Sequence, residues 1–297
     1  MAGRRMTPTL RRPSRLAVIA SIGGLALIVV TAALLLFTKS GPHVHLEPGE
    51  AAPAATIDAP PGQDGYLAAS ALDSVGVVPP PPVPGSPRAE ADRKVFLATR
   101  AMEGSPRWAL AASDDDQGVG ATLQDFNCAL GLKVDATSAP ATAQLFTRLI
   151  PDAHRTVEAA KRKFDRKRPF LADPGAICTP KTDELARSPD YPSGHSSWGW
   201  MAALMFAEIA PDHASAVLVR GRAYGESRVV CGVHTASAVE AGRVNGAALV
   251  AALHASSAFR ADLDQARAEL AALRSTGHAP DAGKCADEAR LIAAPAY

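Results

Sequence analysis

The chain has 297 residues, of which 47% are hydrophobic and 21% charged, so it can bury the core of one large domain or two small ones. Its 31 Lys and Arg balance 30 Asp and Glu, which argues against a general nucleic-acid-binding protein. The charge is unevenly placed, because residues 1–40 hold six basic residues and no acid, which leaves 25 basic and 30 acidic residues elsewhere. We therefore expect the two parts to face different surroundings.

Residues 16–37 form an uncharged stretch of 22 residues that is rich in Ala, Leu, Ile and Val. As a helix, this length crosses the hydrocarbon core of a bilayer. The five Arg before it predict that residues 1–15 are a cytoplasmic basic tail and that the rest is exported to the periplasm or another extracytoplasmic space. The stretch is longer than the apolar part of a signal peptide and a poor cleavage site comes after it, so we expect an uncleaved anchor, with a cleaved signal peptide as the alternative.

Residues 38–65 are rich in Pro and Ala and are expected to form a linker before a domain at 66–297. The run Pro79–Pro82 belongs either to this stalk or to an arm packed on the domain. All four cysteines, at positions 128, 178, 231 and 285, lie on the exported side. Their even number favours disulfides, but three pairings are possible and buried free thiols remain the alternative.

From about residue 89, apolar residues recur at helical spacing between short Pro, Gly and Asp breaks. Neither an alternating strand pattern nor a repeat is evident. The expected fold is therefore all-α, a single globular helical domain, and none of its helices is expected to be a second membrane span. The expected helices are 89–112, 139–150, 151–168, 197–210, 213–226, 237–256 and 259–273.

Three short clusters carry residues suited to chemistry. The first is a basic run from Lys161 to Arg168, which Pro169 follows. If the run is helical, Lys161 and Arg168 share one face, where two cations can hold an oxyanion. By itself, such a run is more often a solvated surface.

The second cluster is Ser193, Gly194 and His195, directly before an apolar helical segment. A helix N-terminus offers free backbone N–H groups to an anion, and glycine lets the backbone come close. His195 adds a titratable proton at that point. The plain alternative is a helix cap with an incidental histidine.

The third cluster contains Arg228 and His234. Six residues apart, they do not share a helical face, so we expect a loop that carries Arg228 and a helix that starts near His234. Arg228 is suited to bind an anion, and His234 to attack or to relay protons. A surface arginine and a core histidine are the alternative.

Together the clusters supply three cations, a glycine-containing helix start and two imidazoles. This set suits phosphoryl transfer, in which cations neutralise the phosphate oxygens, one histidine attacks phosphorus and the other protonates the leaving oxygen. No cluster of metal-binding carboxylates is evident, so the sequence predicts neither a metal nor a cofactor.

The combined pattern of Lys-x6-Arg-Pro, Pro-Ser-Gly-His and Ser-Arg-x5-His resembles the three-part signature of the type 2 phosphatidic acid phosphatase superfamily. Within it, the chain is similar to the class A bacterial non-specific acid phosphatases, from about Tyr66 almost to the C-terminus. Further resemblance lies in Val78–Gly85, Gly104–Trp108, Phe126–Leu130 and Ala241–Arg243.

The resemblance implies an exported, metal-independent acid phosphatase that acts on phosphomonoesters and releases inorganic phosphate, in a family whose members often form homo-oligomers. It implies that His234 is the nucleophile that forms a phosphohistidine and that His195 is the general acid. It implies as phosphate-binding residues Lys161, Arg168, Ser193, Gly194 and Arg228.

One departure from the family pattern concerns the end of the third motif. The family has His-x3-Asp, whose Asp orients the nucleophilic imidazole, whereas this chain has Ala238 at that position. Glu240 is a poor substitute, since on a helix it points about 200° away from position 238. In serine proteases, loss of such a carboxylate costs about 10⁴ in rate.

The sequence leaves three alternatives for the function. The first is an acid phosphatase with impaired activity, in which Ala238→Asp would raise turnover. The second is a phosphate-binding pseudoenzyme of the same fold. The third is a lipid phosphatase or a vanadate-dependent haloperoxidase-like enzyme.

Overall fold

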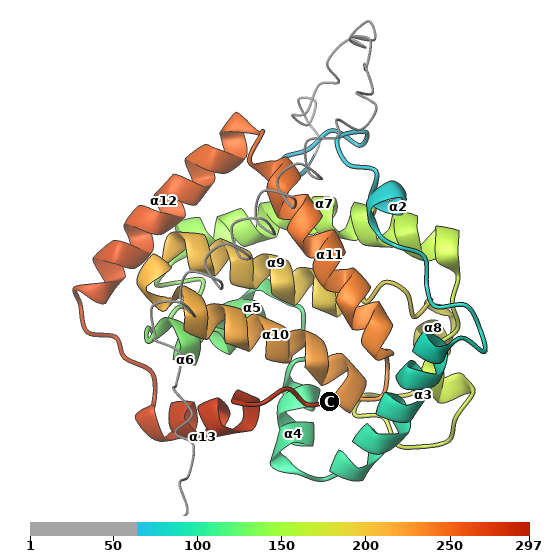
Figure 1. The fold of residues 1–297 in the computed structure, drawn as a ribbon. Helices are drawn as coiled ribbons and strands as arrows, with labels where there is room; N and C mark the ends of the chain where they lie inside the picture. The colour runs from blue at the N-terminus through green and yellow to red at the C-terminus, as the bar shows by residue number, and fades with distance from the viewer. Residues whose placement is uncertain (1–63) are drawn as a thin grey trace, which may run out of the picture. The chain divides into compact units, whose positions relative to one another are not determined.

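The computed structural model describes residues 64–297, and every regular element in that range is a helix (Figure 1). The prediction of an all-α domain is therefore confirmed. The predicted basic tail, the apolar segment 16–37 and nearly all of the linker lie outside the described residues. Between residues 64 and 297, no helix combines the length and apolarity needed to cross a bilayer.

Five long helices make up most of the domain, and shorter helices surround them (Figure 1). The long helices are α7 (Pro140–Phe164), α9 (Gly194–Ile209), α10 (Ala214–Val230), α11 (Ala236–Leu253) and α12 (Ser257–Arg274). The shorter helices are α2 (Ser74–Val77), α3 (Pro87–Thr99), α4 (Pro106–Ser113), α5 (Val119–Asp125), α6 (Asn127–Leu130), α8 (Asp183–Arg187) and α13 (Ala282–Ile292). Three short 3₁₀ turns complete the set at Arg100–Met102, Pro169–Leu171 and Pro211–His213.

Helix α9 is the centre of the domain. Its sequence is apolar nearly all round, as is typical of a buried helix, and it packs mainly against α10 and α11 (Figure 1). Gly242 and Gly246 of α11 permit this contact, because a Cβ at either position would lie 2.6 Å from Ser193 O or 2.5 Å from Ser197 O. The N-terminus of α9 is thereby fixed against α11.

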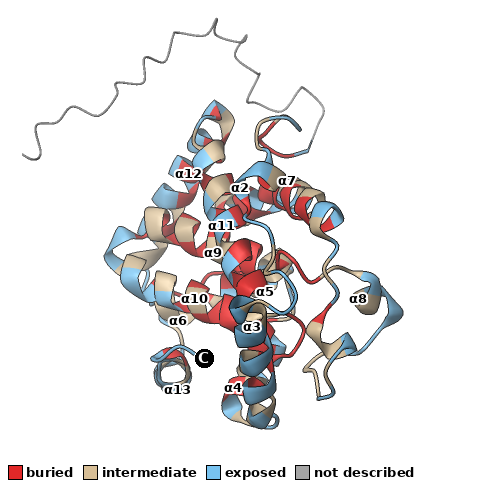
Figure 2. Cartoon of the chain, turned by 45° about the vertical axis from the view of Figure 1, so that its right-hand side comes forward, coloured by how far each residue is buried: buried red, intermediate tan, exposed pale blue. Residues whose placement is uncertain are grey.

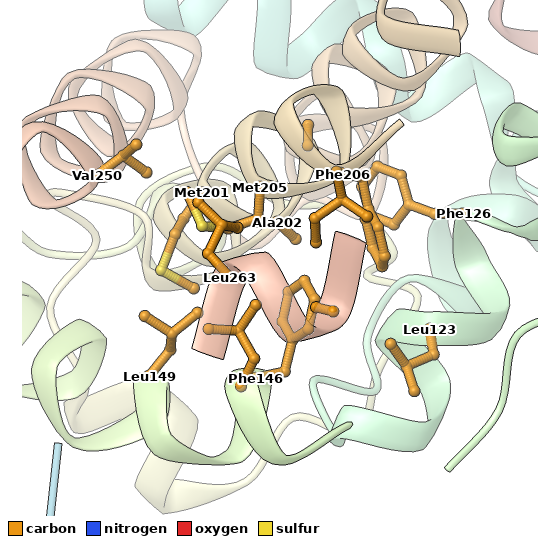
Figure 3. Close-up of a cluster of buried hydrophobic side chains, with 14 of the residues drawn as sticks. Leu123, Phe126, Phe146, Leu149, Met201, Ala202, Met205, Phe206, Val250 and Leu263 are labelled. Atoms are coloured by element: carbon orange, nitrogen blue, oxygen red, sulfur yellow. The ribbon is translucent and has the colours of Figure 1, made fainter. Parts of the chain in front are cut away.

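The main hydrophobic core lies between α7, α9 and α12. The Phe146 and Phe206 rings are 5.0 Å apart between centroids, and Phe126 lies 5.2 Å from Phe206 on the other side (Figure 3). Met201 and Leu263 fill the remaining space between these helices. Figure 2 shows that buried residues gather around α9 and α10, whereas α3 and α8 are mostly exposed or intermediate.

The two helices predicted at 139–150 and 151–168 are one helix, α7. Pro151 lies inside it, although an internal proline costs about 3 kcal/mol. Buried residues on both sides of the proline, Leu149 and Ala153 among them, keep the helix straight enough to pack. It ends at Phe164, where Asp165 adopts a left-handed conformation with φ 41°. The prediction that Lys161 and Arg168 share a helical face is therefore wrong.

The predicted helix 89–112 is also interrupted, because Gly104 has φ +73° and Ser105 caps a new helix by accepting a hydrogen bond from Trp108 N. Helix α13 was not among the predicted helices. All four cysteines form disulfides, Cys128–Cys285 and Cys178–Cys231, which settles the pairing that the sequence left open. The first of these bonds joins α13 to α6.

Candidate active site

The three sequence clusters meet at one place in the fold. A cavity of about 340 Å³ beside α7 is lined by five of the seven predicted site residues, Lys161, Arg168, Gly194, His195 and His234. An adjoining cavity of about 340 Å³ shares Arg168, Ser188 and His195 with the first and adds Arg228. Of the predicted residues, only Ser193 lines neither cavity.

His234 lies in the turn between α10 and α11 and is 1% exposed. Its Nδ1 is 2.6 Å from Asp190 O and 2.9 Å from Asp190 Oδ1, and its Nε2 is 3.2 Å from Arg168 Nη1. Because a guanidinium can only donate, Nε2 is the acceptor and Nδ1 carries the proton. Burial, with a smaller effect from Arg168, lowers the pKa of His234 to about 3. The ring is therefore neutral, and its Nε2 accepts a hydrogen bond from Arg168 beside the cavity that His234 lines.

A carboxylate does orient this ring, and it comes from Asp190, so the expectation that Ala238 leaves His234 without one is wrong. Asp190 is held in turn by Arg166 Nε at 2.8 Å and by Thr235 Oγ1 at 3.0 Å. Burial by itself raises the pKa of the Asp190 carboxyl, but the His234 and Arg166 hydrogen bonds outweigh it, and the net pKa lies below the usual value. Asp190 thus stays ionised opposite the imidazole.

Ala238, at the position where the family motif has Asp, and Glu240 lie in other surroundings. Ala238 is fully buried in a small apolar cluster with Val78, Tyr191 and Ala241. Glu240 is exposed and lies 3.4 Å from Arg88, so it takes no part in the site, as its spacing predicted.

Two cations on the α7 side are held by Ser188. Lys161 Nζ donates to Ser188 Oγ at 3.0 Å, Arg168 Nη2 lies 3.2 Å from the same oxygen, and Arg168 Nε donates to Ser188 O at 2.8 Å. Burial is the main cause that lowers the pKa of Arg168 to about 10, and burial followed by the charge of Arg168 lowers that of Lys161. Poorly solvated cations of this kind attract an anion strongly.

The N-terminus of α9 lies at the cavity, which Gly194 and His195 line. Ser193 is its N-cap, and its Oγ accepts hydrogen bonds from Ser196 N at 3.2 Å and Ser196 Oγ at 2.9 Å. Its hydroxyl therefore satisfies the helix end, while Gly194 faces the cavity. His195 follows in the first turn, and its Nε2 lies 3.0 Å from the carbonyl oxygen of Asp115.

Arg228 lies in the last turn of α10 and not in a loop, contrary to the prediction. It is 1% exposed, and its Nη2 forms an ion pair with Asp115. Its Nε and Nη1 have no hydrogen-bond partner among residues 64–297. Buried donors without partners are costly, so these two nitrogens are hydrogen-bond donors that the described residues leave unsatisfied.

Sequence patterns missed the residues that hold the site together. Asp190 stands three residues before Ser193, and its role depends on a contact with a residue 44 positions later. Arg166 lies within the basic run but was not among the predicted site residues, whereas it joins Asp190, Asp92 and Ser237. Ser188 and Asp115 belong to loops without any pattern.

The arrangement can bind a tetrahedral oxyanion between cations and two imidazoles. One imidazole is neutral and oriented by a carboxylate, which suits a nucleophile. Within the described part of the chain, no group of three or more His, Cys, Asp or Glu side chains is placed to hold a metal ion. A helical domain with such a site belongs to the class of phosphate-handling enzymes.

Comparisons with known proteins define the family. Residues 140–261 match the PAP2 superfamily. The chain is 42% identical over 203 residues to an acid phosphatase of Zymomonas mobilis, covering 68% of this chain and 77% of the relative. It is 36% identical to a non-specific acid phosphatase of Providencia stuartii, covering 72% of this chain and 91% of the relative, and 34% identical to that of Salmonella typhimurium, covering 67% and 80%.

The chain therefore belongs to the class A bacterial non-specific acid phosphatases of the PAP2 superfamily, and it is an acid phosphatase.

Proposed function

We propose that this acid phosphatase hydrolyses phosphomonoesters through a phosphohistidine on His234, with His195 as the general acid. One observation carries the proposal: His234 Nδ1 is held by Asp190 at 2.9 Å, while its Nε2 lies 3.2 Å from Arg168 on the wall of the cavity. The Asp190 contact also removes the reason to expect impaired activity from Ala238.

In the first step, the Nε2 lone pair of His234 attacks phosphorus, and the bond from phosphorus to the ester oxygen breaks. The protonated ring of His195 gives its proton to that oxygen, so the alcohol leaves neutral. The Nδ1 proton of His234 stays in place, and the Asp190 carboxylate stabilises the positive charge that the ring acquires. Lys161, Arg168 and Arg228 balance the charge on the three remaining phosphate oxygens.

In the second step, water attacks phosphorus and gives a proton to His195, which is now neutral. The bond between phosphorus and Nε2 breaks, its electron pair returns to the ring, and inorganic phosphate leaves. Each residue regains its starting state. The chain's own cations supply the charge that a metal would otherwise supply, so we propose a metal-independent reaction.

The experiment is rapid-quench labelling in alkaline SDS with a ³²P-labelled aryl phosphate. We expect an acid-labile, base-stable label on His234, no label in His234→Gln, and accumulation of label in His195→Asn with a good leaving group. Turnover should persist in EDTA. A wild-type enzyme that turns over but never carries the label, or keeps its activity in His234→Gln, contradicts the mechanism.

We also propose that the domain works outside the cytoplasm, anchored by the apolar segment 16–37 or secreted after cleavage. The two disulfides support an oxidising compartment, and the Arg-rich residues before the segment support export of the residues after it. Cell fractionation with a tagged C-terminus tests this. Activity that is released by osmotic shock or stays with washed membranes supports it, and activity confined to the cytosol contradicts it.

A further inference from the structure

The loop that joins α4 to α5 reaches the active site through Asp115. Two parts of this residue touch two different predicted site residues. Its carboxylate forms an ion pair with Arg228 Nη2, and its main-chain carbonyl lies 3.0 Å from His195 Nε2. The same carboxylate lies 3.7 Å from His195 Nε2. Asp115 therefore links His195 of α9 to Arg228 of α10.

The ion pair leaves the rest of the Arg228 guanidinium free for a phosphate. Asp115 occupies only Nη2, whereas Nε and Nη1 are buried without a partner among residues 64–297. A guanidinium offers its donors in a fixed planar fork, so holding one nitrogen also fixes the direction of the others. Asp115 thus fixes the direction of the Arg228 side chain.

The contact with His195 fixes the tautomer of that ring. A carbonyl oxygen only accepts, so Nε2 carries a hydrogen, and Nδ1 is the nitrogen left to serve an ester oxygen. Nδ1 can give up a proton only if the ring is an imidazolium. The imidazolium form of His195 has to be stabilised by a neighbouring group. Burial first, and then the charges of Arg228, His234 and Arg168, lower the pKa of His195 well below its usual value.

We infer that Asp115 is a positioning residue for the phosphatase reaction, which holds Arg228 for the phosphate and stabilises the protonated His195 that the leaving alcohol requires. This inference rests on the proposed function of His195 as the general acid. Asp115 acts through Arg228 and His195 and does not itself contact the substrate. Its effect should therefore depend on how much the leaving oxygen needs a proton.

The experiment compares Asp115→Asn with Asp116→Asn. The control removes the same charge from the neighbouring residue, which is exposed and whose side chain accepts a hydrogen bond from Gly118 N, a bond that Asn can keep. Each variant is assayed for kcat/KM from pH 4 to 9 on p-nitrophenyl phosphate and on an alkyl phosphate. The aryl alcohol leaves without help, whereas the alkyl alcohol needs protonation.

We expect Asp115→Asn to lower kcat/KM about 10-fold or more on the alkyl ester and about 3-fold or less on the aryl ester. The alkaline limb of its pH profile should move to lower pH, since the imidazolium loses a neighbouring negative charge. Asp115→Glu should recover part of the alkyl-ester activity. Asp116→Asn should match the wild type on both esters.

Two results would overturn the inference. One is an Asp115→Asn enzyme that is indistinguishable from Asp116→Asn. The other is an equal loss on both esters with no shift of the pH profile and a lower melting temperature, which indicates a structural role alone. Failure of the proposed mechanism is separate, since it is seen in the wild type as turnover without label on His234.

Discussion

Asp190 and His234 form the central pair of the site, with Asp190 Oδ1 2.9 Å from His234 Nδ1 across 44 residues of sequence. The carboxylate that the family motif leads one to expect at position 238 is thus supplied from the segment before the second motif. Both side chains are almost fully buried, and Arg166 and Thr235 fix the carboxylate from behind. The pair has the geometry of an acid that orients a catalytic imidazole.

Asp190→Asn should therefore lower kcat by about 10²- to 10⁴-fold, because the amide can hold the wrong tautomer of His234 and cannot stabilise its positive charge. Steady-state turnover of p-nitrophenyl phosphate measures this. Glu240→Gln is the matched control, since Glu240 is exposed and pairs with Arg88 at the surface, and it should behave as the wild type. A loss of less than twofold in Asp190→Asn would show that the main-chain carbonyl of Asp190 is sufficient.

Ala238→Asp should destabilise the enzyme and should not raise turnover. The new carboxylate would lie in the apolar cluster of Val78, Tyr191 and Ala241, and position 238 adjoins Asp190 through Thr235 Oγ1, which bonds both. Burying a second negative charge there should cost about 3–5 kcal/mol of unfolding free energy. Urea unfolding measures it, with Ala236→Asp at the partly exposed start of α11 as the control. An unchanged midpoint would contradict this.

The same geometry predicts coupling between the two positions. In the Asp190→Asn background, Ala238→Asp should raise kcat by about 10-fold or more, because it returns one carboxylate to the place where the family motif has it. A double-mutant cycle on kcat gives the coupling. Two changes whose effects simply add would mean that a carboxylate at 238 cannot serve His234 in this fold.

The fold class could be predicted because helical periodicity and breaks are local. The site could be predicted only as three separate clusters, since each motif is local but their meeting is not. Asp190 could not be found, because a single Asp before Tyr191 has no pattern and its partner is remote in sequence. The course of α7 through Pro151 and its end at Asp165 also depend on tertiary packing and one backbone conformation.

The buried His234 predicts a pH dependence of stability. The pKa of its ring is lowered to about 3 in the folded enzyme, against 6.5 for the ordinary group. Between these values, the unfolded chain binds a proton that the folded one does not, so stability should fall as the pH falls from about 6.5 to 3. His234→Gln should reduce this slope by roughly 1 kcal/mol per pH unit at most, in urea titrations with the disulfides intact. His278→Gln, an exposed site, should leave the slope unchanged.

Asp125 should have the opposite effect on the pH dependence of stability. Burial raises its pKa to about 7 despite the Arg220 guanidinium 3.6 Å away, and its Oδ2 has no hydrogen-bond partner among residues 64–297. Above the ordinary pKa of 3.8 the unfolded chain loses a proton that the folded enzyme keeps, so stability should fall as pH rises to about 7.

Asp125→Asn removes this penalty and should stabilise the enzyme by roughly 1 kcal/mol or more at pH 8, with little effect at pH 4. Unfolding midpoints at both pH values test this, against Asp212→Asn at an exposed position. Equal midpoints for Asp125→Asn and wild type at pH 8 would mean that Arg220 fully compensates the buried carboxylate, so that the group titrates as it does in the unfolded chain.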